Sequence, residues 1–404
     1  MLPSTVRRAP RALSLIALAA ATLLAACSPQ SDATPTPTRT AAAPGTASVP
    51  AASPLPATPT PPPAATATLP PDASAGGVMT SFPPDVNPLT GEQVADPAVL
   101  DRRPLAIKIS NSPMEYVRPQ SGIGAADLVF EHYAEGGVTR LTAVYLSRDA
   151  QIIGPVRSGR LIDLEVPVMY HAMFVCSGYS SGVKALVRAS DLYAENRIIS
   201  QDFGAGVPPF QRIDRGPDVP YEHTLYTSTS AMWAETDARG LNGRQELKGM
   251  AFAAAPSAGG VPVTTLQVNY AAAEARVEWR YDDAAGRWLR SEGGVAFTDA
   301  LDGQQVSSAN VVVLYANHVE TDIQEDALGS MSIQIQLWGT GPAGIYRDGL
   351  YFDGFWIRQQ PGDMLGFTDS AGNLIPFKPG NTWFQVVTLD AGTETSGGTV
   401  LVTP

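Results

Sequence analysis

Cysteine is almost missing from this chain of 404 residues, which contains two, Cys27 and Cys176. A framework of several disulfides is therefore excluded, and the fold has to be held by its hydrophobic core. Charged residues are also scarce, at 16% of the chain, and positive charge is the scarcer sign. With 27 Lys and Arg against 39 Asp and Glu, the formal net charge is −12. Such an acidic protein repels nucleic acid, which we exclude as a partner.

The first apolar run is shorter than a membrane-spanning helix. Residues Leu13–Ala26 follow three arginines, at positions 7, 8 and 11, and this pattern predicts a cleaved signal peptide over residues 1–26. It ends in Leu24-Ala25-Ala26-Cys27, which resembles the lipobox of bacterial lipoproteins. In that family the cysteine is acylated and becomes the new N-terminus. The alternative is an ordinary signal peptide with a chance cysteine.

Lipidation of Cys27 would leave Cys176 as the remaining thiol. Cleavage would change the formal net charge from −12 to −15, because the removed segment carries three arginines and no acid. Two or more acyl chains give stable attachment to a bilayer. We therefore expect a protein anchored by lipid to the cell membrane, on its extracytoplasmic face.

The segment after Cys27 has the composition of a linker. Residues 28–80 are mostly Pro, Ala, Thr and Ser, and their charges are Asp32, Arg39 and Asp72. Such a segment cannot bury enough apolar surface to offset its ordering entropy. We predict a disordered tether over residues 27–84, which holds the folded part away from the membrane.

The remaining chain predicts an α+β fold in two domains. Residues 85–252 mix strand patterns, among them Leu105–Ser110, Leu128–Tyr133 and Leu141–Ser147, with helix patterns such as Ser181–Ala189. A small-residue stretch, Ala253–Gly260, is the expected boundary. Residues 261–404 are expected to form a β-rich domain packed with the first.

Several motifs give the chain a family resemblance. They include NPLTGE (residues 87–92), RPLAIKISN (103–111), RPQSGIGAADLVFE (118–131), IGPVRSGR (153–160), HTLY (223–226) and GTGPAGIYRDGLYFDGFW (339–356). In these the chain resembles the YerB-like bacterial lipoproteins, a two-domain family of unknown function. The resemblance covers nearly everything after the tether. It implies a lipid-anchored protein with a mixed α/β domain and a β-rich domain, and it implies no reaction.

Polar residues gather at the ends of the first predicted strands, where folded domains usually present a site. Guanidinium groups suit carboxylate and phosphate because they form two hydrogen bonds to either. We predict non-catalytic binding of an anionic envelope component, such as a peptidoglycan stem or a teichoic-type polymer, or scaffolding of a protein partner. The alternative is an internal network of arginines and acids that fixes loops. The predicted ligand-binding residues are Arg118, Glu131, Arg140, Arg157, Arg160 and His223.

A hydrolase is the second hypothesis. Gly178-Tyr179-Ser180-Ser181-Gly182 matches the G-x-S-x-G turn that exposes a nucleophilic serine between a strand and a helix. His223 follows it and could act as the base. The bland alternative is that Ser180 caps the next helix, and we favour a protein without catalytic activity.

Other patterns suggest ligands less strongly. The spacing His318-x-Glu320-x-Asp322 could hold a divalent metal on one face of a strand, but acids at strand ends are usually solvated. Gly339-x-Gly341-x-x-Gly344 matches a dinucleotide fingerprint, but Pro342 and a strand pattern replace the required helix, so no cofactor is predicted. Aromatic residues of the second domain could line a carbohydrate platform, although a core role is commoner: Trp338, Tyr351, Trp356 and Trp383.

Overall fold

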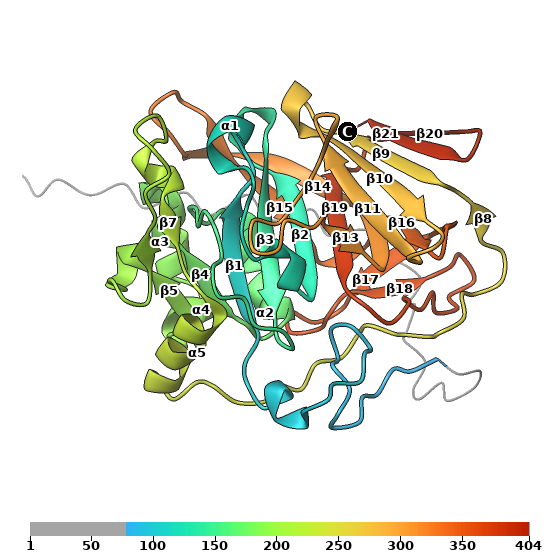
Figure 1. Cartoon of the computed structure of the whole chain (residues 1–404), viewed down its shortest axis with the longest axis horizontal. Helices are drawn as coiled ribbons and strands as arrows, with labels where there is room; N and C mark the ends of the chain where they lie inside the picture. The colour runs from blue at the N-terminus through green and yellow to red at the C-terminus, as the bar shows by residue number, and fades with distance from the viewer. Residues whose placement is uncertain (1–77, 404) are drawn as a thin grey trace, which may run out of the picture. The chain divides into compact units, whose positions relative to one another are not determined.

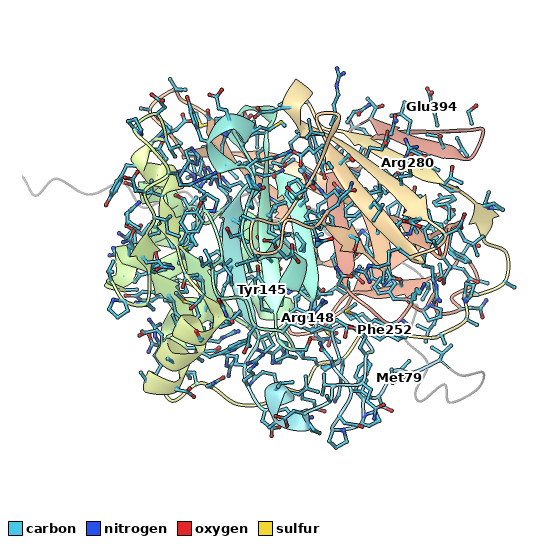
Figure 2. The ribbon with its side chains drawn as sticks, viewed as in Figure 1. Met79, Tyr145, Arg148, Phe252, Arg280 and Glu394 are labelled. Atoms are coloured by element: carbon cyan, nitrogen blue, oxygen red, sulfur yellow. The ribbon has the colours of Figure 1, made fainter. Side chains whose placement is uncertain are left out.

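The computed structural model describes residues 78–403 (Figure 1). The predicted signal peptide, Cys27 and most of the predicted tether lie outside the described residues. The described chain begins at an isolated bridge in which Met79 N donates to Phe252 O over 2.7 Å, and both residues are labelled in Figure 2. The expected boundary segment Ala253–Gly260 therefore begins directly after the residue that pairs with the start of the described chain.

Twelve strands form one large sheet. The N-terminal half of the chain contributes β1 (Leu105–Ser110), β2 (Leu128–Tyr133), β3 (Thr139–Tyr145), β4 (Met173–Cys176) and β5 (Ile198–Ser200). The C-terminal half contributes β8 (Val261–Pro262), β14 (Asn310–Gln324), β15 (Met331–Gln336), β16 (Gly339–Arg347), β17 (Leu350–Arg358), β18 (Gly366–Thr368) and β19 (Thr382–Thr388). Their order is β18-β17-β16-β14-β19-β2-β3-β1-β4-β5, with β15 beside β14 and β8 beside β17.

The two halves of the chain meet inside this sheet. Strand β2 pairs in parallel with β19, from Leu128 opposite Thr382 to Glu131 opposite Gln385. Strands β1, β4 and β5 are parallel to one another, whereas β3 runs antiparallel between β1 and β2. The large sheet is therefore mixed, and its hydrogen-bond ladder passes without a break from one half to the other.

A second sheet of seven strands comes entirely from the C-terminal half. Its strands are β9 (Thr265–Asn269), β10 (Arg276–Asp282), β11 (Arg287–Glu292), β12 (Val295–Ala296), β13 (Ser307–Ser308), β20 (Gly392–Ser396) and β21 (Thr399–Thr403). The order is β12-β11-β10-β9-β21-β20, with β13 beside β11. Burial alternates along β11, as expected for a sheet with one face on a core. A short hairpin joins β6 (Gln211–Arg212) to β7 (Leu225–Tyr226).

Helices are short and come mainly from the N-terminal half, where α3, α4 and α5 gather on the left of Figure 1. The α-helices are α1 (Met114–Val117), α2 (Val166–Met169), α3 (Ser181–Arg188), α4 (Asp191–Ala194) and α5 (Thr229–Ala238). The 3₁₀ helices are η1 (Pro97–Leu100), η2 (Ile123–Ala125), η3 (Glu135–Gly137), η4 (Leu161–Leu164), η5 (Gln201–Phe203), η6 (Tyr221–His223) and η7 (Ala273–Ala275). Serine side chains cap α3, α4 and α5, which satisfies amide groups that the helices leave free.

Each face of the large sheet packs on its own hydrophobic cluster. One cluster joins sheet residues such as Phe130 and Phe384 to η4, α2, α3 and α4. The other joins sheet residues such as Ile107 and Trp383 to the seven-stranded sheet and α5. Side chains fill both layers (Figure 2). Neighbouring residues of one strand point to opposite faces, so consecutive side chains enter different cores.

The predicted fold class is confirmed. The N-terminal half mixes helices with strands, and the C-terminal half is almost entirely β within the described residues. The expected strand over Leu128–Tyr133 is β2 to the residue, and the expected helix over Ser181–Ala189 is α3. The domain bounds at residues 85–252 and 261–404 stay a prediction, because one sheet runs through both.

Candidate functional site

The predicted binding residues lie on opposite sides of the large sheet. On β2, Glu131 and His132 are neighbours and are both fully buried. Glu131 meets Arg290 and Trp383 on the side of the seven-stranded sheet, whereas His132 meets Lys108 on the other side. The predicted site is thus two separate groups of residues.

Glu131 belongs to a buried ion network. Its Oε2 accepts hydrogen bonds from Arg290 Nη2 at 2.8 Å, and from Trp383 Nε1 and Gln385 Nε2 at 3.1 Å each. Arg290 also pairs with Glu292, 2.5 Å away. Because Glu131 lies on β2 while its partners lie on β11 and β19, this network joins the two halves of the chain.

Arg118 belongs to the same network. Its Nη2 lies 2.7 Å from Glu292 Oε1, and its guanidinium lies 4.8 Å from the centre of the Phe297 ring. Asn111 connects the parts by donating to both Glu131 and Glu292, at 3.3 and 3.0 Å. Glu131 and Arg118 therefore contact internal partners, which is the structural alternative raised by the sequence.

A fully buried lysine lies on the opposite face of the sheet. Lys108 Nζ lies 2.8 Å from Asp163 Oδ2, 2.9 Å from Thr142 Oγ1 and 2.6 Å from His132 Nε2. Burial lowers the pKa of Lys108 to about 8, although Asp163 opposes this shift. Burial and the Lys108 charge hold the pKa of His132 well below its ordinary value. The neutral His132 ring then accepts from Lys108 at Nε2 and donates from Nδ1 to Tyr133 O.

Arg160 is occupied by acidic partners next to this lysine. Its Nε lies 2.7 Å from both oxygens of Glu135, and its backbone N–H donates to Asp163 Oδ2 at 2.7 Å. Glu135 consequently has a lowered pKa, because the Arg160 charge and hydrogen bonds outweigh burial. Arg160 therefore holds η3 and η4 together.

Arg140 and Arg157 are the arginines of the predicted site that lack an acid partner at ion-pair distance within residues 78–403. Arg140 lies on β3, opposite His132 and Ser110, and its Nη1 donates to Ser158 O over 3.0 Å. The Arg157 side chain has no hydrogen bond within the described chain, and its buried Nε has no partner. Both side chains are half-buried.

His223, at the end of η6, completes this group. It is 3% exposed, and its Nδ1 has no hydrogen-bond partner among the described residues. Burial and the nearby charges of Arg157 and Arg140 lower its pKa to about 4, while exposed Glu222 opposes this shift. We name Arg140, Arg157 and His223 the arginine site. It combines two cations that have no acid at ion-pair distance with two buried nitrogen atoms, Arg157 Nε and His223 Nδ1, that have no hydrogen-bond partner among the described residues.

The backbone explains why the arginine site forms at this place. Parallel strands β1 and β4 separate at their carboxyl ends, and residues 155–159 pass between them: Arg157 N donates to Lys108 O, and Ser177 N donates to Arg157 O, each over 3.0 Å. The crevice outside the carboxyl ends of parallel strands is the usual place of ligands in open α/β sheets. The segment therefore carries Arg157 to a position that suits a binding group.

Ser180 has a structural role in this structure. It is the N-cap of α3, where its Oγ accepts from Val183 N at 3.4 Å. The ring of His223 contacts Tyr116, with 5.8 Å between ring centres, and no hydrogen bond joins His223 to Ser180 in the described part. A histidine with a pKa near 4 is also a weak base at neutral pH. The predicted strand–turn–helix context is present, but a nucleophile–base pair is not assembled.

The other patterns give no ligand set. No group of three or more His, Cys, Asp or Glu residues that could hold a metal occurs in the part of the chain described. His318 Nδ1 bonds to Ala316 O, and its ring packs edge-on against Tyr133. Gly339 to Gly344 lie in strand β16 rather than at a helix start.

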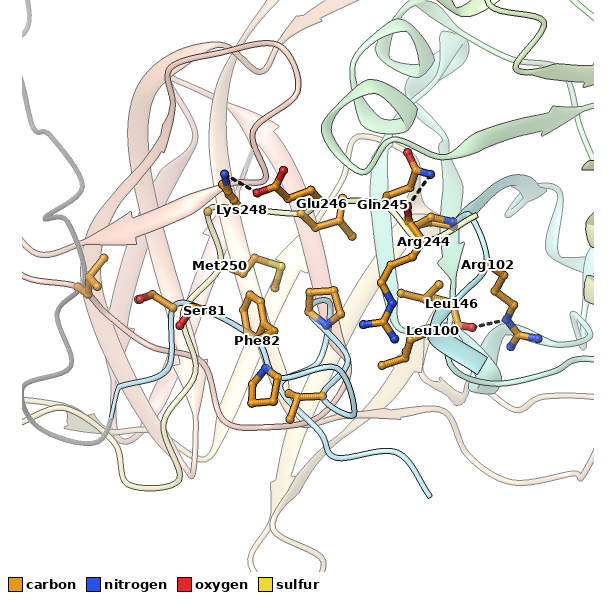
Figure 3. Close-up of a pocket in the computed structure, with 18 residues that line it drawn as sticks. Ser81, Phe82, Leu100, Arg102, Leu146, Arg244, Gln245, Glu246, Lys248 and Met250 are labelled. Atoms are coloured by element: carbon orange, nitrogen blue, oxygen red, sulfur yellow. Dashed lines mark hydrogen bonds and ion pairs between the residues drawn. The ribbon is translucent and has the colours of Figure 1, made fainter. Parts of the chain in front are cut away.

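A cavity of about 710 Å³ lies away from all these residues, beside the entry of the described chain (Figure 3). Its wall is largely apolar, with Phe82, Leu100 and Met250 among the lining residues. Its three cations already have partners: Lys248 pairs with Glu246, Arg244 with Asp101 and Arg102 with Asp149. The cavity therefore does not offer free cations for the predicted anion.

Sequence reasoning missed several residues of both groups. Arg290 and Glu292 lie in the C-terminal half, in the stretch Trp279–Arg290 and just after it, and nothing local marks them as partners of Glu131. Lys108 is the exception, because a lysine inside the apolar run Leu105–Ser110 is a signal that could have been used: a buried lysine needs an acid partner.

Comparison with known proteins places the chain in a family. Residues 89–242 and 266–384 match the N-terminal and C-terminal domains of a protein of unknown function, DUF3048. A relative named "Putative lipoprotein YerB" from Bacillus subtilis (strain 168) is 30% identical over 313 residues, which cover 77% of this chain and 88% of the relative. The crystal structure of the YerB protein from Bacillus subtilis has a TM-score of 0.61 and 26% identity, and the similarity covers 75% of this chain and 96% of that chain. No helix in residues 78–403 is long and apolar enough to cross a bilayer. The order of the motifs, the paired domains and the shared fold agree, and the chain belongs to the YerB-like DUF3048 family.

Proposed function

We propose that this protein is a lipoprotein, anchored through Cys27 to the extracytoplasmic face of the cell membrane, that binds an anionic component of the cell envelope without catalysis. Support for the anchor comes from the lipobox-like sequence that ends at Cys27 and from the name of the Bacillus subtilis relative, "Putative lipoprotein YerB". The tether then gives the body a reach of several tens of ångströms from the bilayer.

The observation that carries the binding proposal is the unneutralised charge of the arginine site. Burying or half-burying a cation without an acid partner is unfavourable, and proteins usually avoid it. Within residues 78–403, Arg140 and Arg157 have no acid at ion-pair distance, although the charge of exposed Glu222 acts on Arg157. Arg160, in the same stretch of sequence as Arg157, is paired with Glu135. An anion that accepts hydrogen bonds from these groups would remove the imbalance.

The proposal narrows the predicted set of binding residues. Arg140, Arg157 and His223 contact the ligand, and Arg160 positions them from its pair with Glu135. Glu131 and Arg118 act indirectly, by fixing the sheet from its other face. Peptidoglycan stems offer carboxylates and teichoic-type polymers offer phosphodiesters, and guanidinium groups accept either.

The test is a calorimetric titration of the full chain, purified in detergent, with a carboxylate-bearing stem peptide and with a glycerol phosphate oligomer. Arg157→Gln and Arg140→Gln should each weaken binding roughly ten-fold or more, because a charge-assisted hydrogen bond contributes about 1.5–3 kcal/mol. The matched control is Arg280→Gln, since Arg280 is 70% exposed on the seven-stranded sheet (Figure 2). Equal affinity in all variants, or binding of neither ligand, would contradict the proposal.

A further inference from the structure

Trp338 is the tryptophan for which residues 78–403 provide no aromatic, cationic or hydrogen-bonding partner to the side chain. All six tryptophans lie in the described residues, and five of them are at least 95% buried. Those five have an aromatic neighbour, a stacked arginine or a hydrogen-bonded indole: Trp233, Trp279, Trp288, Trp356 and Trp383. Trp338 is half-buried, and no ring contact, cation or hydrogen bond from residues 78–403 reaches its side chain. Part of its indole surface is therefore exposed to solvent.

Trp338 lines a second cavity, of about 580 Å³. One wall comes from the N-terminal half, at the end of η4, in α2 and between α3 and β5. The other wall comes from the C-terminal half, with Trp338 before β16 and the loop after Arg358. The cavity thus lies where the segments matched by the two family domains meet, which is a preferred place for small-molecule sites, and its volume is in their usual range.

Planar polar side chains form the remainder of the wall. Arg358 is 3% exposed; its Nη1 donates to Leu337 O at 2.8 Å and to Glu165, while its buried Nε has no partner. Arg197 is 7% exposed and pairs with Glu195 at 2.6 Å. An unused buried donor beside an unpaired aromatic face points to a ligand with both polar and apolar surfaces.

The charge of this cavity differs from that of the arginine site. Three acids line it, Glu165, Asp191 and Glu195, against the two arginines 197 and 358. Burial raises the pKa of Glu165 even though Arg358 lies beside it. An acidic balance of this kind disfavours anions. It suits an uncharged ligand whose hydroxyl groups donate to carboxylates and accept from guanidinium groups.

We infer that this cavity binds a neutral saccharide, with one face of a pyranose ring stacked on Trp338. The axial C–H groups of a pyranose form an apolar face that packs on an aromatic ring, while its equatorial hydroxyls point outward to planar polar side chains. Glu165, Arg197 and Arg358 are the residues that would bind those hydroxyls. This site is separate from the arginine site and does not depend on it.

The experiment is isothermal titration calorimetry of the full chain with chitotriose and with maltotriose, each to millimolar concentration. Wild type should bind at least one of them saturably. Trp338→Leu, which keeps an apolar side chain but removes the aromatic face, should weaken binding ten-fold or more, and Trp338→Phe should retain part of it. Phe355→Leu is the matched control, because Phe355 is 39% exposed on β17 and does not line the cavity.

Two results would overturn the inference. One is the absence of saturable binding by either saccharide to the folded wild-type chain. The other is equal affinity of wild type and Trp338→Leu, with both melting at the same temperature. Arg157→Gln should leave saccharide affinity unchanged. Failure of the saccharide proposal can therefore be distinguished from failure of the anion-binding proposal at the arginine site. If Trp338→Leu lowers the melting temperature, Trp338→Phe decides the outcome, because it preserves the packing and reduces only the stacking area.

Discussion

Lys108 and Asp163 form an ion pair from which water is excluded: Nζ and Oδ2 are 2.8 Å apart, and the side chains are 0% and 1% exposed. The pair joins the first strand of the large sheet to η4. Removing one partner of such a pair leaves a buried charge without compensation, which typically costs about 3–5 kcal/mol. Lys108→Met should therefore lower the free energy of unfolding by about that amount. Lys108→Met with Asp163→Leu should recover much of it, and urea unfolding measures both.

The same lysine predicts a pH dependence. Its pKa is lowered from 10.5 to about 8 in the folded protein, so between these values the unfolded chain binds one more proton at this position. The free energy of unfolding of wild type, relative to Lys108→Met, should therefore rise as pH increases from about 8 to 10.5. Taking the difference between the two proteins cancels the other titrating groups. A flat or falling difference would mean that Lys108 is not desolvated as described.

Because the Arg290 side chain is fully buried, we expect its replacement to destabilise the folded protein strongly. Arg290→Met leaves Glu131 and Glu292 without their shared cation, and the unfolding free energy should fall by about 3–5 kcal/mol. The control is Arg280→Met on the neighbouring strand β10, where the exposed side chain should change stability by about 0.5 kcal/mol at most. Similar losses in the two variants would show that the network contributes little.

The Ser180→Ala variant distinguishes a helix-capping role of Ser180 from a catalytic one. Loss of the cap should cost about 1 kcal/mol of stability. We expect no labelling of wild type by a fluorophosphonate probe, because His223 is not bonded to Ser180 and its lowered pKa makes it a weak base. Labelling of wild type that disappears in Ser180→Ala would instead establish the hydrolase and refute the non-catalytic function.

His223 should report the binding of an anion. Its folded pKa is about 4, below its ordinary value of 6.5, so in the free protein stability falls as pH drops from about 6.5 toward 4. A bound anion favours the charged imidazole and should shift the titration of His223 upward. Sulfate is a suitable probe because its charge is constant over this range, and NMR of the imidazole nitrogens gives the midpoint. The same midpoint with and without sulfate, in wild type as in Arg157→Gln, would argue against an anion at the arginine site.

Local sequence patterns were sufficient to predict secondary-structure elements but not to predict which strands pair with each other. Leu128–Tyr133 is predicted correctly because it contains Val129, Phe130 and Tyr133, which favour strands, and is flanked by turn-forming residues. Ser180 predicts the start of α3 because capping is decided within one turn. The pairing of β2 with β19 depends on residues more than two hundred positions apart, and no local pattern encodes it.

The candidate site shows the same limit. Alternation along β2 correctly implies that Glu131 and His132 face opposite ways. It does not predict which arginines lie on the same side of the sheet as Glu131 and which as His132, because loops place Arg118 and Arg157. The position of Trp338 at a cavity was equally hard to predict, because in the sequence it is one of several aromatic residues of a β-rich half, and its partial exposure depends on how distant segments pack around it.

The parallel junction of β2 with β19 has a consequence for biogenesis. While the chain is being synthesised, β2 has an unpaired edge until β19 is available, and Glu131 lacks its cation until Arg290 of β11 is available. We therefore expect that the two family segments cannot be separated, in evolution or in the laboratory. A chain cut between them would yield two fragments, each with an unpaired sheet edge, and these fragments would become soluble only by reassociating.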